Sequence, residues 1–415
     1  MKNFLVHTSD TKREMLNAIG LTEIEDLFKQ IPEAVRVGKF DISKPLSEAQ
    51  LQREIKRLAK KNETDKITFC GGGVYNKFIP ACVGQVAQRF EFLTAYTPYQ
   101  AEISQGTLQI MYEFQTMMSR LTGMDTANAT VYDGGTACAE AVLMSARISK
   151  KNRALVNKNI NPEYLEVIKT YCRAGGVEVE VFEELPANTG DFACVLYQVP
   201  NYFGEIAYPK KLDDTLLVVC VDLSTLSILK PPSEYGADIV VADVQSLGVP
   251  MSFGGPHAGI IATKEKYMRQ LVGRLAGKTV DKDGNTAYTL TIQTREQHIK
   301  REKATGNICS NQALIGLWVT LYLSLLGEKG FRQAGYLSAK TAHSLADGLK
   351  KKGYKILNKN FFNEFLLEVN DADEFLSKLD GVGILGGIKV SESGVLVAAT
   401  ELITEEDVEL YLSAV

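Results

Sequence analysis

Two apolar stretches near the middle of the chain decide its fold: LLVVCVD at residues 216–222 and ADIVVADV at residues 237–244. Each is short, is rich in β-branched residues and carries an aspartate near its carboxyl end. Uninterrupted apolar runs of this length are typical of strands that are buried on both faces of a parallel sheet. Further runs of the same kind lie at residues 153–156, 177–182, 192–199 and 259–262.

Helical patterns separate these runs. Asn161 is a good N-cap and Pro162 suits the first helical position, which predicts a helix to about residue 174. A longer helix is expected at about 107–121, and an Asp-Gly turn within residues 281–285 predicts a hairpin. Strands that alternate with helices predict an α/β fold, a doubly wound and largely parallel sheet covered by helices.

The two ends of the chain depart from this alternation. Apolar residues recur at helical spacing between residues 21 and 31, and Ser47 with Gln50 forms a capping-box pattern. An apolar helix at about 311–326 is followed by Gly327, which marks a boundary. The sequence therefore predicts an N-terminal helical segment (1–65), a large domain (66–327) and a small C-terminal α+β domain (328–415).

The composition excludes several classes of protein. A net charge of −4, without a block of Lys or Arg, argues against binding to nucleic acid or to a membrane surface. The longest apolar run, 313–326, is shorter than the roughly 18 residues of a membrane span. Seven cysteines without a CxxC pair suggest reduced thiols, and MKNFLVHTSD lacks the apolar stretch of a signal peptide. We therefore expect a cytoplasmic protein.

The loops that follow the strands are where a parallel sheet binds its ligands. Asp133-Gly134-Gly135-Thr136 precedes an Ala-rich helix, so its backbone N–H groups and its hydroxyl can hold a phosphate at the helix N-terminus. A plain tight turn is the alternative for any Gly-Gly pair at a helix start. No clustered metal-ligand motif is present, and no metal is expected.

Asp222 ends the most apolar of the runs. A carboxylate there can accept a hydrogen bond from the protonated ring nitrogen of pyridoxal phosphate, although a surface aspartate is the alternative. A covalently held cofactor also needs a lysine, and Lys230 is the only lysine between Asp222 and Ser246. Lys230 precedes two prolines in a connecting loop and Lys264 begins a later helix, so both are expected to be solvated. The sequence thus offers the surroundings of a cofactor site without its covalent anchor.

Four motifs carry a resemblance to a known family. They are GGGVYNKFIP (71–80), YTPYQAEISQG (96–106), FGGPHAG (253–259) and REQHIKREKATGNIC (295–309). Together they resemble the glycine cleavage system P-protein family, the pyridoxal-phosphate glycine decarboxylases. More narrowly, the chain is similar to subunit 1, the N-terminal half, of the two-subunit type, and the resemblance covers nearly all 415 residues.

The resemblance implies a fold-type-I pyridoxal-phosphate transferase fold and a heterodimer that pairs again into an α2β2 tetramer. The Schiff-base lysine then belongs to subunit 2, whereas Gln245 and Ser246 occupy the matching place here. This chain alone should therefore not hold the cofactor covalently. With subunit 2, the enzyme would decarboxylate glycine and pass the aminomethyl group to the lipoyl arm of the H-protein.

The resemblance also implies which residues cross the subunit interface to the partner's cofactor or substrate. They are Tyr96, Tyr99, Gln100, Glu102, Ser104, Arg301, Lys303, Thr305 and Asn307. Thr305 is expected to reach the phosphate of the cofactor. Packing is the alternative for the two tyrosines, and a solvated surface is the alternative for Arg301 and Lys303.

A second set of residues would line a vestigial site within this chain: Asp133, Gly134, Gly135, Thr136, Asp222, Ser246 and His257. His257 is equally compatible with a purely structural place in its loop. His298 is expected to serve structure or the interface, and Cys309 is expected to be a small core residue rather than a redox-sensitive thiol.

Two other functions stay open on the sequence alone. The first is a self-sufficient pyridoxal-phosphate lyase or desulfurase that uses another lysine of this chain. The second is a non-catalytic scaffold, in which the fold survives only to stabilise or regulate a partner.

Overall fold

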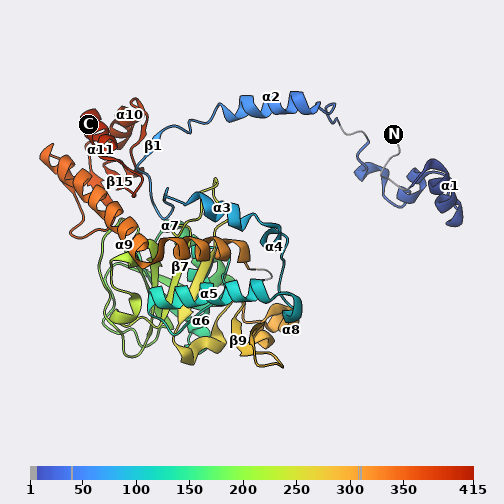
Figure 1. Ribbon diagram of the computed structural model, residues 1–415, viewed down its shortest axis with the longest axis horizontal. Helices are drawn as coiled ribbons and strands as arrows, with labels where there is room; N and C mark the ends of the chain where they lie inside the picture. The colour runs from blue at the N-terminus through green and yellow to red at the C-terminus, as the bar shows by residue number, and fades with distance from the viewer. Residues whose placement is uncertain (1–6, 39–40, 307, 309–310) are drawn as a thin grey trace. The chain divides into compact units, whose positions relative to one another are not determined.

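Figure 1 shows the computed structural model of the chain, which describes residues 7–38, 41–306, 308 and 311–415. The chain divides into two compact units, residues 1–64 and 65–415. The described part of the first unit contains helix α1 (Ser9–Ala18), a short 3₁₀ helix (Ile24–Phe28) and helix α2 (Glu48–Ala59), none of which has a buried residue. The predicted capping box of Ser47 and Gln50 begins α2.

A seven-stranded sheet forms the centre of the second unit, with the strand order β2-β8-β7-β6-β5-β3-β4. The strands are β2 (Thr126–Ala127), β3 (Arg153–Asn157), β4 (Glu178–Phe182), β5 (Cys194–Val199), β6 (Leu216–Asp222), β7 (Ile239–Asp243) and β8 (Gly259–Thr263). Strands β3 to β7 are parallel, whereas β8 and β2 are antiparallel to their neighbours. The fold-type-I prediction of a mixed, mostly parallel sheet is confirmed.

Alternate residues of the central strands pack into two different helical layers. In β6, Leu217 and Val219 face a core that includes α5 (Gln105–Thr122) and α9 (Ala313–Lys351), while Val218 faces the core of α6 and α7. Helices α6 (Gly134–Ser149) and α7 (Pro162–Ala174) cover that second face (Figure 1). Burial on both faces explains the uninterrupted apolar runs, since each fully buried aliphatic side chain contributes about 1.5–3 kcal/mol.

Helix α9 also reaches the small C-terminal sheet. That sheet has the order β11-β12-β15-β14, is antiparallel throughout and is flanked by α10 (Ala372–Asp380) and α11 (Glu405–Ala414). Its strands are β11 (Lys355–Ile356), β12 (Glu364–Glu368), β14 (Ile388–Ser391) and β15 (Gly394–Ala398). A separate pair joins β1 (Ile67–Thr68) to β13 (Ile384–Leu385), and Phe69 is fully buried in the core of the small sheet.

One local expectation differs from the structure. The apolar helix expected at about 311–326 continues past Gly327 in α9, where Gly327 introduces a kink with φ 57° and ψ −174°. Val131 makes a single bridge to Gly259. The predicted hairpin is present as β9 (Ala276–Val280) and β10 (Thr286–Leu290). The domain boundary at 327/328 stays a prediction.

Among the described helices, α9 is the one that is long and apolar enough to cross a membrane. Its first half belongs to the core beneath the large sheet, because Ile315, Val319 and Tyr322 are buried against β-strand residues there. A buried core helix meets the same length and composition criteria as a membrane span. The packing of α9 is that of a core helix.

Candidate functional site

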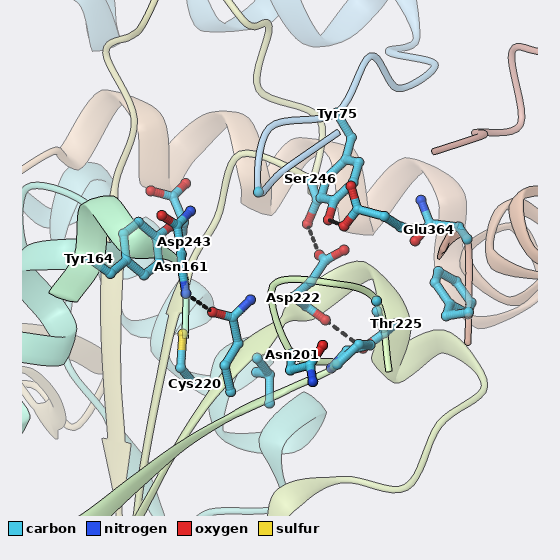
Figure 2. Close-up of a pocket in the computed structure, with 17 residues that line it drawn as sticks. Tyr75, Asn161, Tyr164, Asn201, Cys220, Asp222, Thr225, Asp243, Ser246 and Glu364 are labelled. Carbon is cyan, nitrogen blue, oxygen red and sulfur yellow. Dashed lines mark hydrogen bonds between the residues drawn. The ribbon is translucent and has the colours of Figure 1, made fainter. Parts of the chain in front are cut away.

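A cavity of about 40 Å³ lies at the carboxyl ends of β5, β6 and β7, where a parallel sheet binds its ligands (Figure 2). Its lining contains Gly73, Tyr75, Asn161, Tyr164, Gln198, Pro200, Asn201, Gly204, Cys220, Val221, Asp222, Thr225, Asp243, Ser246, Phe362, Asn363 and Glu364. The volume accommodates a few water molecules. Of the predicted vestigial residues, only Asp222 and Ser246 line it.

The carboxylate of Asp222 accepts hydrogen bonds from hydroxyl and backbone N–H groups of the chain itself. The Ser246 hydroxyl donates to Asp222 Oδ1 over 2.5 Å. Ser224 donates its backbone N–H to Oδ1 over 3.0 Å and its hydroxyl to Oδ2 over 2.9 Å, because Asp222 is the N-cap of the 3₁₀ helix Leu223–Ser227. The atoms expected to accept from a pyridinium ring therefore already have donors.

The N-terminus of α6, which could hold a phosphate or form a plain tight turn, binds carboxylates of this chain. Asp133 caps the helix, with its Oδ1 accepting from the N–H of Thr136 over 2.7 Å. Asp243 Oδ2 accepts from the N–H of Gly134 over 2.9 Å. Tyr164 packs directly against the start of α6. A Cβ built on Gly134 would lie only 2.5 Å from the hydroxyl oxygen of Tyr164. Figure 2 shows Tyr164 and Asp243 side by side.

This geometry does not fit pyridoxal phosphate. A phosphate at the α6 turn would have to displace two carboxylates that carry the same sign of charge, and the described residues that line the cavity include no lysine. Burial raises the pKa of Asp243 to about 6, so the group is mostly ionised at neutral pH. His257, the remaining predicted residue, lies next to Asp243, with Nδ1 at 3.8 Å from Oδ2, and does not line the cavity.

The opposite wall of the cavity carries a buried pair, Tyr75 and Glu364, that sequence reasoning missed. Glu364, on β12, accepts from the hydroxyl of Tyr75 over 2.9 Å and from the N–H of Gly72 over 2.6 Å. Burial raises the pKa of Glu364 to about 7. A signal was present, because Glu364 is a charged residue within the apolar run FFNEFLL (361–367).

The raised pKa of Glu364 predicts that the folded state loses stability as the pH rises. The group titrates near 4.5 when exposed and near 7 when folded, so the folded chain binds more protons between these values. The stabilisation is complete below pH 4.5 and is lost as the pH rises through 7. The unfolding free energy should decrease between pH 5 and pH 8 in the wild type. In Glu364→Gln we expect this decrease to be smaller by about 2 kcal/mol.

Urea unfolding at the two pH values measures this effect. The matched control is Glu368→Gln on the same strand, where the carboxylate is half-exposed and pairs with Lys355. Asp243 contributes with the same sign between about pH 4 and 6, so the comparison of variants, rather than the wild-type slope, isolates Glu364. An unchanged slope in Glu364→Gln would contradict the assignment.

The residues expected at the subunit interface lie outside this cavity, on two loops that meet each other. Tyr96, Tyr99, Gln100, Glu102, Arg301 and Lys303 are exposed, Ser104 and Thr305 are partly buried, and Asn307 lies outside the described residues, as does Cys309. The ring of Tyr99 lies 5.0 Å from that of His298, which joins the loop at 96–106 to the loop at 295–306. The structure therefore brings the two sets of predicted interface residues together.

Three buried or nearly buried charged residues at the base of these loops were missed by sequence reasoning: Arg274, Arg295 and Glu296. Arg274 and Arg295 are 3% and 5% exposed, and the side chain of Glu296 is 9% exposed. Arg295 donates to the carbonyl oxygens of Leu271 and Gly273, each over 2.5 Å. Nothing in their spacing distinguishes them from surface charges. Within the described residues, no group of His, Cys, Asp or Glu side chains is placed to hold a metal ion.

The fold and the position of the cavity define the class first. A mixed seven-stranded sheet between helical layers, with a small C-terminal sheet, is the fold of the fold-type-I pyridoxal-phosphate enzymes. The cysteine desulfurase of Thermococcus onnurineus NA1 superposes with a TM-score of 0.61 over 90% of this chain and 98% of its own, with 13% identity. At that identity the similarity extends to the fold alone.

The family follows from closer similarities. The glycine cleavage system P-protein family model matches residues 2–415, so the chain belongs to that family. A glycine dehydrogenase (decarboxylating) subunit 1 from Geobacillus thermodenitrificans, described as probable, is 43% identical, with 100% of this chain and 98% of the relative covered. The crystal structure of an inhibitor-bound glycine decarboxylase (P-protein) superposes with a TM-score of 0.89 and 40% identity, over 100% and 99% of the two chains.

Proposed function

We propose that this chain, as subunit 1 of a glycine dehydrogenase (decarboxylating), works only together with a second subunit that carries both the cofactor and the Schiff-base lysine. One observation carries the proposal: the carboxylates of Asp222 and Asp243 at the strand ends already accept hydrogen bonds from groups of the chain itself. The described residues that line this cavity include no lysine. Lys264 pairs instead with Asp238, and Lys230 is exposed.

In this proposal the chain contributes the two exposed loops to a site of the partner. Tyr96 and Tyr99 are 76% and 48% exposed, so their side chains can contact groups outside this chain. Arg301 and Lys303 add positive charge on the second loop, which suits a phosphate or the carboxylate of glycine. In this proposal Arg301 and Lys303 bind and orient the phosphate or the carboxylate. Pyridoxal phosphate, when bound to the partner, supplies the electron sink that decarboxylation needs.

The wider setting belongs to the same proposal. We infer glycine as substrate, the lipoylated H-protein as acceptor of the aminomethyl group and an α2β2 assembly with subunit 2. The cytoplasm is the proposed compartment, and it agrees with six free thiols at the cysteines that the structure describes. The exposed aromatic and aliphatic residues of the 90–103 segment, Phe90, Leu93, Tyr96, Tyr99 and Ile103, suit burial against a partner.

The proposal predicts that cofactor binding and glycine decarboxylation depend on the partner. The purified chain mixed with pyridoxal phosphate should show no borohydride-reducible absorbance band and release no CO₂ from glycine. Addition of the lysine-bearing subunit should restore both, and peptide mapping after reduction should place the label on that subunit. A label on Lys230 or Lys264 would contradict the proposal and support a self-sufficient lyase or desulfurase.

A scaffold role is distinguished by variants within the reconstituted complex. Tyr96→Phe and Thr305→Ala leave the described core of the chain intact, because Tyr96 is exposed and Thr305 is only partly buried. Turnover that falls while assembly is unchanged, as judged by size-exclusion chromatography, supports a contribution to the site. Unchanged turnover in both variants would favour a purely structural subunit.

A further inference from the structure

Arg274 lies beneath the two exposed loops and has no assigned role. It belongs to the buried segment that follows the 3₁₀ helix Glu265–Gln270, and it is 3% exposed. Its carbonyl oxygen accepts from the N–H of Ala129 over 2.8 Å, which fixes its backbone to the segment that follows β2. A buried arginine at the base of a proposed site requires an explanation, because burial of a guanidinium without compensation is costly.

The guanidinium of Arg274 contacts both loops. Its Nη2 donates to the hydroxyl oxygen of Tyr99 over 3.3 Å, and its Cζ lies 5.6 Å from the centre of the Tyr99 ring. Its Nε lies 3.8 Å from Oε2 of Glu296, on the second loop. The same Oε2 lies 3.7 Å from Nδ1 of His298, whose ring contacts Tyr99. Three side chains from two segments, Arg274, Glu296 and His298, thus form a cluster with the phenol of Tyr99.

The direction of the bond between Arg274 and Tyr99 follows from chemistry. A guanidinium only donates hydrogen bonds, whereas a phenol both donates and accepts. The hydroxyl oxygen of Tyr99 is therefore the acceptor, and its own proton remains available for an acceptor elsewhere. Because about half of the Tyr99 side chain is exposed, that acceptor can come from another chain.

The base of the cluster is rigid. Arg295 is anchored through its guanidinium to the carbonyl oxygens of Leu271 and Gly273, in the segment that also contains Arg274. The N–H of Thr305 donates to the carbonyl oxygen of Arg295 over 3.0 Å. Both loops are therefore attached to the same short segment, and Arg274 is the side chain in it that touches Tyr99.

We propose that Arg274 is a positioning residue: it holds the phenol of Tyr99 as a hydrogen-bond donor toward an anionic oxygen, a carboxylate or a phosphate, in the site of the partner subunit. This inference rests on the proposed function, since it needs a partner's site opposite Tyr99. It assigns to Arg274 an effect on turnover that acts only through Tyr99. Glu296 supports Arg274 by balancing its charge.

A double-mutant cycle in the reconstituted complex tests the coupling. We expect Tyr99→Phe to lower kcat/KM for glycine about tenfold, because a hydrogen bond to a charged group is lost. Arg274→Gln should produce a similar loss, and the double variant should be no worse than either single variant. Arg274→Lys, which keeps a charged donor, should recover part of the loss.

Structural damage is separated from positioning by two further variants. Arg147→Gln removes another largely buried arginine, on α6, which donates to the carbonyl oxygen of Gln270, and it reports the general effect on folding and assembly. If Arg274→Gln fails to fold, Glu296→Gln tests the same route by removing the charge beside the guanidinium. It should lower turnover in wild type and leave it unchanged in the Tyr99→Phe background.

The outcomes distinguish this inference from the proposed function. Losses that multiply in the double variant would overturn the positioning role of Arg274, even if the complex needs Tyr99. Full activity of Tyr99→Phe would overturn the contribution of Tyr99 itself, and with it the role of Arg274. Activity without any partner subunit would overturn the proposed function and leave the coupling of the two residues measurable in the single chain.

Discussion

A lysine introduced by Ser246→Lys will not by itself let this chain hold pyridoxal phosphate. Ser246 is the cavity-lining residue next to Asp222, so the substitution supplies an amine at the expected place. The phosphate, however, would still meet Asp133 and Asp243 at the N-terminus of α6. Two unit charges at 4 Å interact by roughly 4 kcal/mol at an effective dielectric constant of about 20, which is about a thousandfold in affinity.

Removal of the obstruction should change that result. We expect the triple variant Ser246→Lys, Asp243→Ser, Tyr164→Phe to bind pyridoxal phosphate at least about a hundredfold more tightly than Ser246→Lys alone. Absorbance titration gives the affinities, and borohydride reduction with peptide mapping locates the label. Ser246→Met, of similar bulk without an amine, is the control. A stoichiometric reducible band in Ser246→Lys alone would show that the α6 turn is not the barrier.

Lys77→Met should destabilise the chain by about 3–5 kcal/mol. The side chains of Lys77 and Glu401 are 3% and 6% exposed, and Nζ lies 3.2 Å from Oε2. Ser338 donates to the same Oε2 over 2.8 Å, and the N–H of Phe78 donates to Oε1 over 2.9 Å. Loss of the ammonium leaves a buried carboxylate without a counter-charge, which costs far more than the pair itself contributes.

Equilibrium urea unfolding measures the difference, with Arg332→Met as the matched control. Arg332 pairs with Glu328 on the surface of α9, and its loss should change the unfolding free energy by less than about 1 kcal/mol. The double variant Lys77→Met, Glu401→Gln should regain most of the lost stability, because no buried charge is left over. A single-variant loss similar to that of Arg332→Met would contradict the account.

The sequence was informative where the cause of structure is local. The buried strands follow from short apolar runs, and the start of α7 follows from Asn161 and Pro162. The hairpin follows from the Asp-Gly turn. Asp222 and Ser246 could be paired because both follow neighbouring strands of a parallel sheet, whose carboxyl ends lie at one edge.

Sequence reasoning failed where the role of a residue depends on a partner that is far away along the chain. Tyr75 and Glu364 are 289 residues apart, and Arg274 lies 175 residues from Tyr99. Spacing carries no information over such intervals. The occupant of the α6 turn was missed for the same reason, because the carboxylate that takes the N–H of Gly134 comes from β7, 109 residues later.

The pairing of β1 with β13, together with the burial of Phe69, means that the core beneath the small C-terminal sheet is not supplied by one continuous stretch of chain. Phe69 follows β1 directly, is fully buried and lies 4.7 Å, ring to ring, from Tyr411 in α11. A fragment that starts at residue 328 would lack the Phe69 side chain, and the space beside Tyr411 that Phe69 fills would be open to water. The C-terminal region is therefore no independent module, and a residue near the beginning of the second unit completes it.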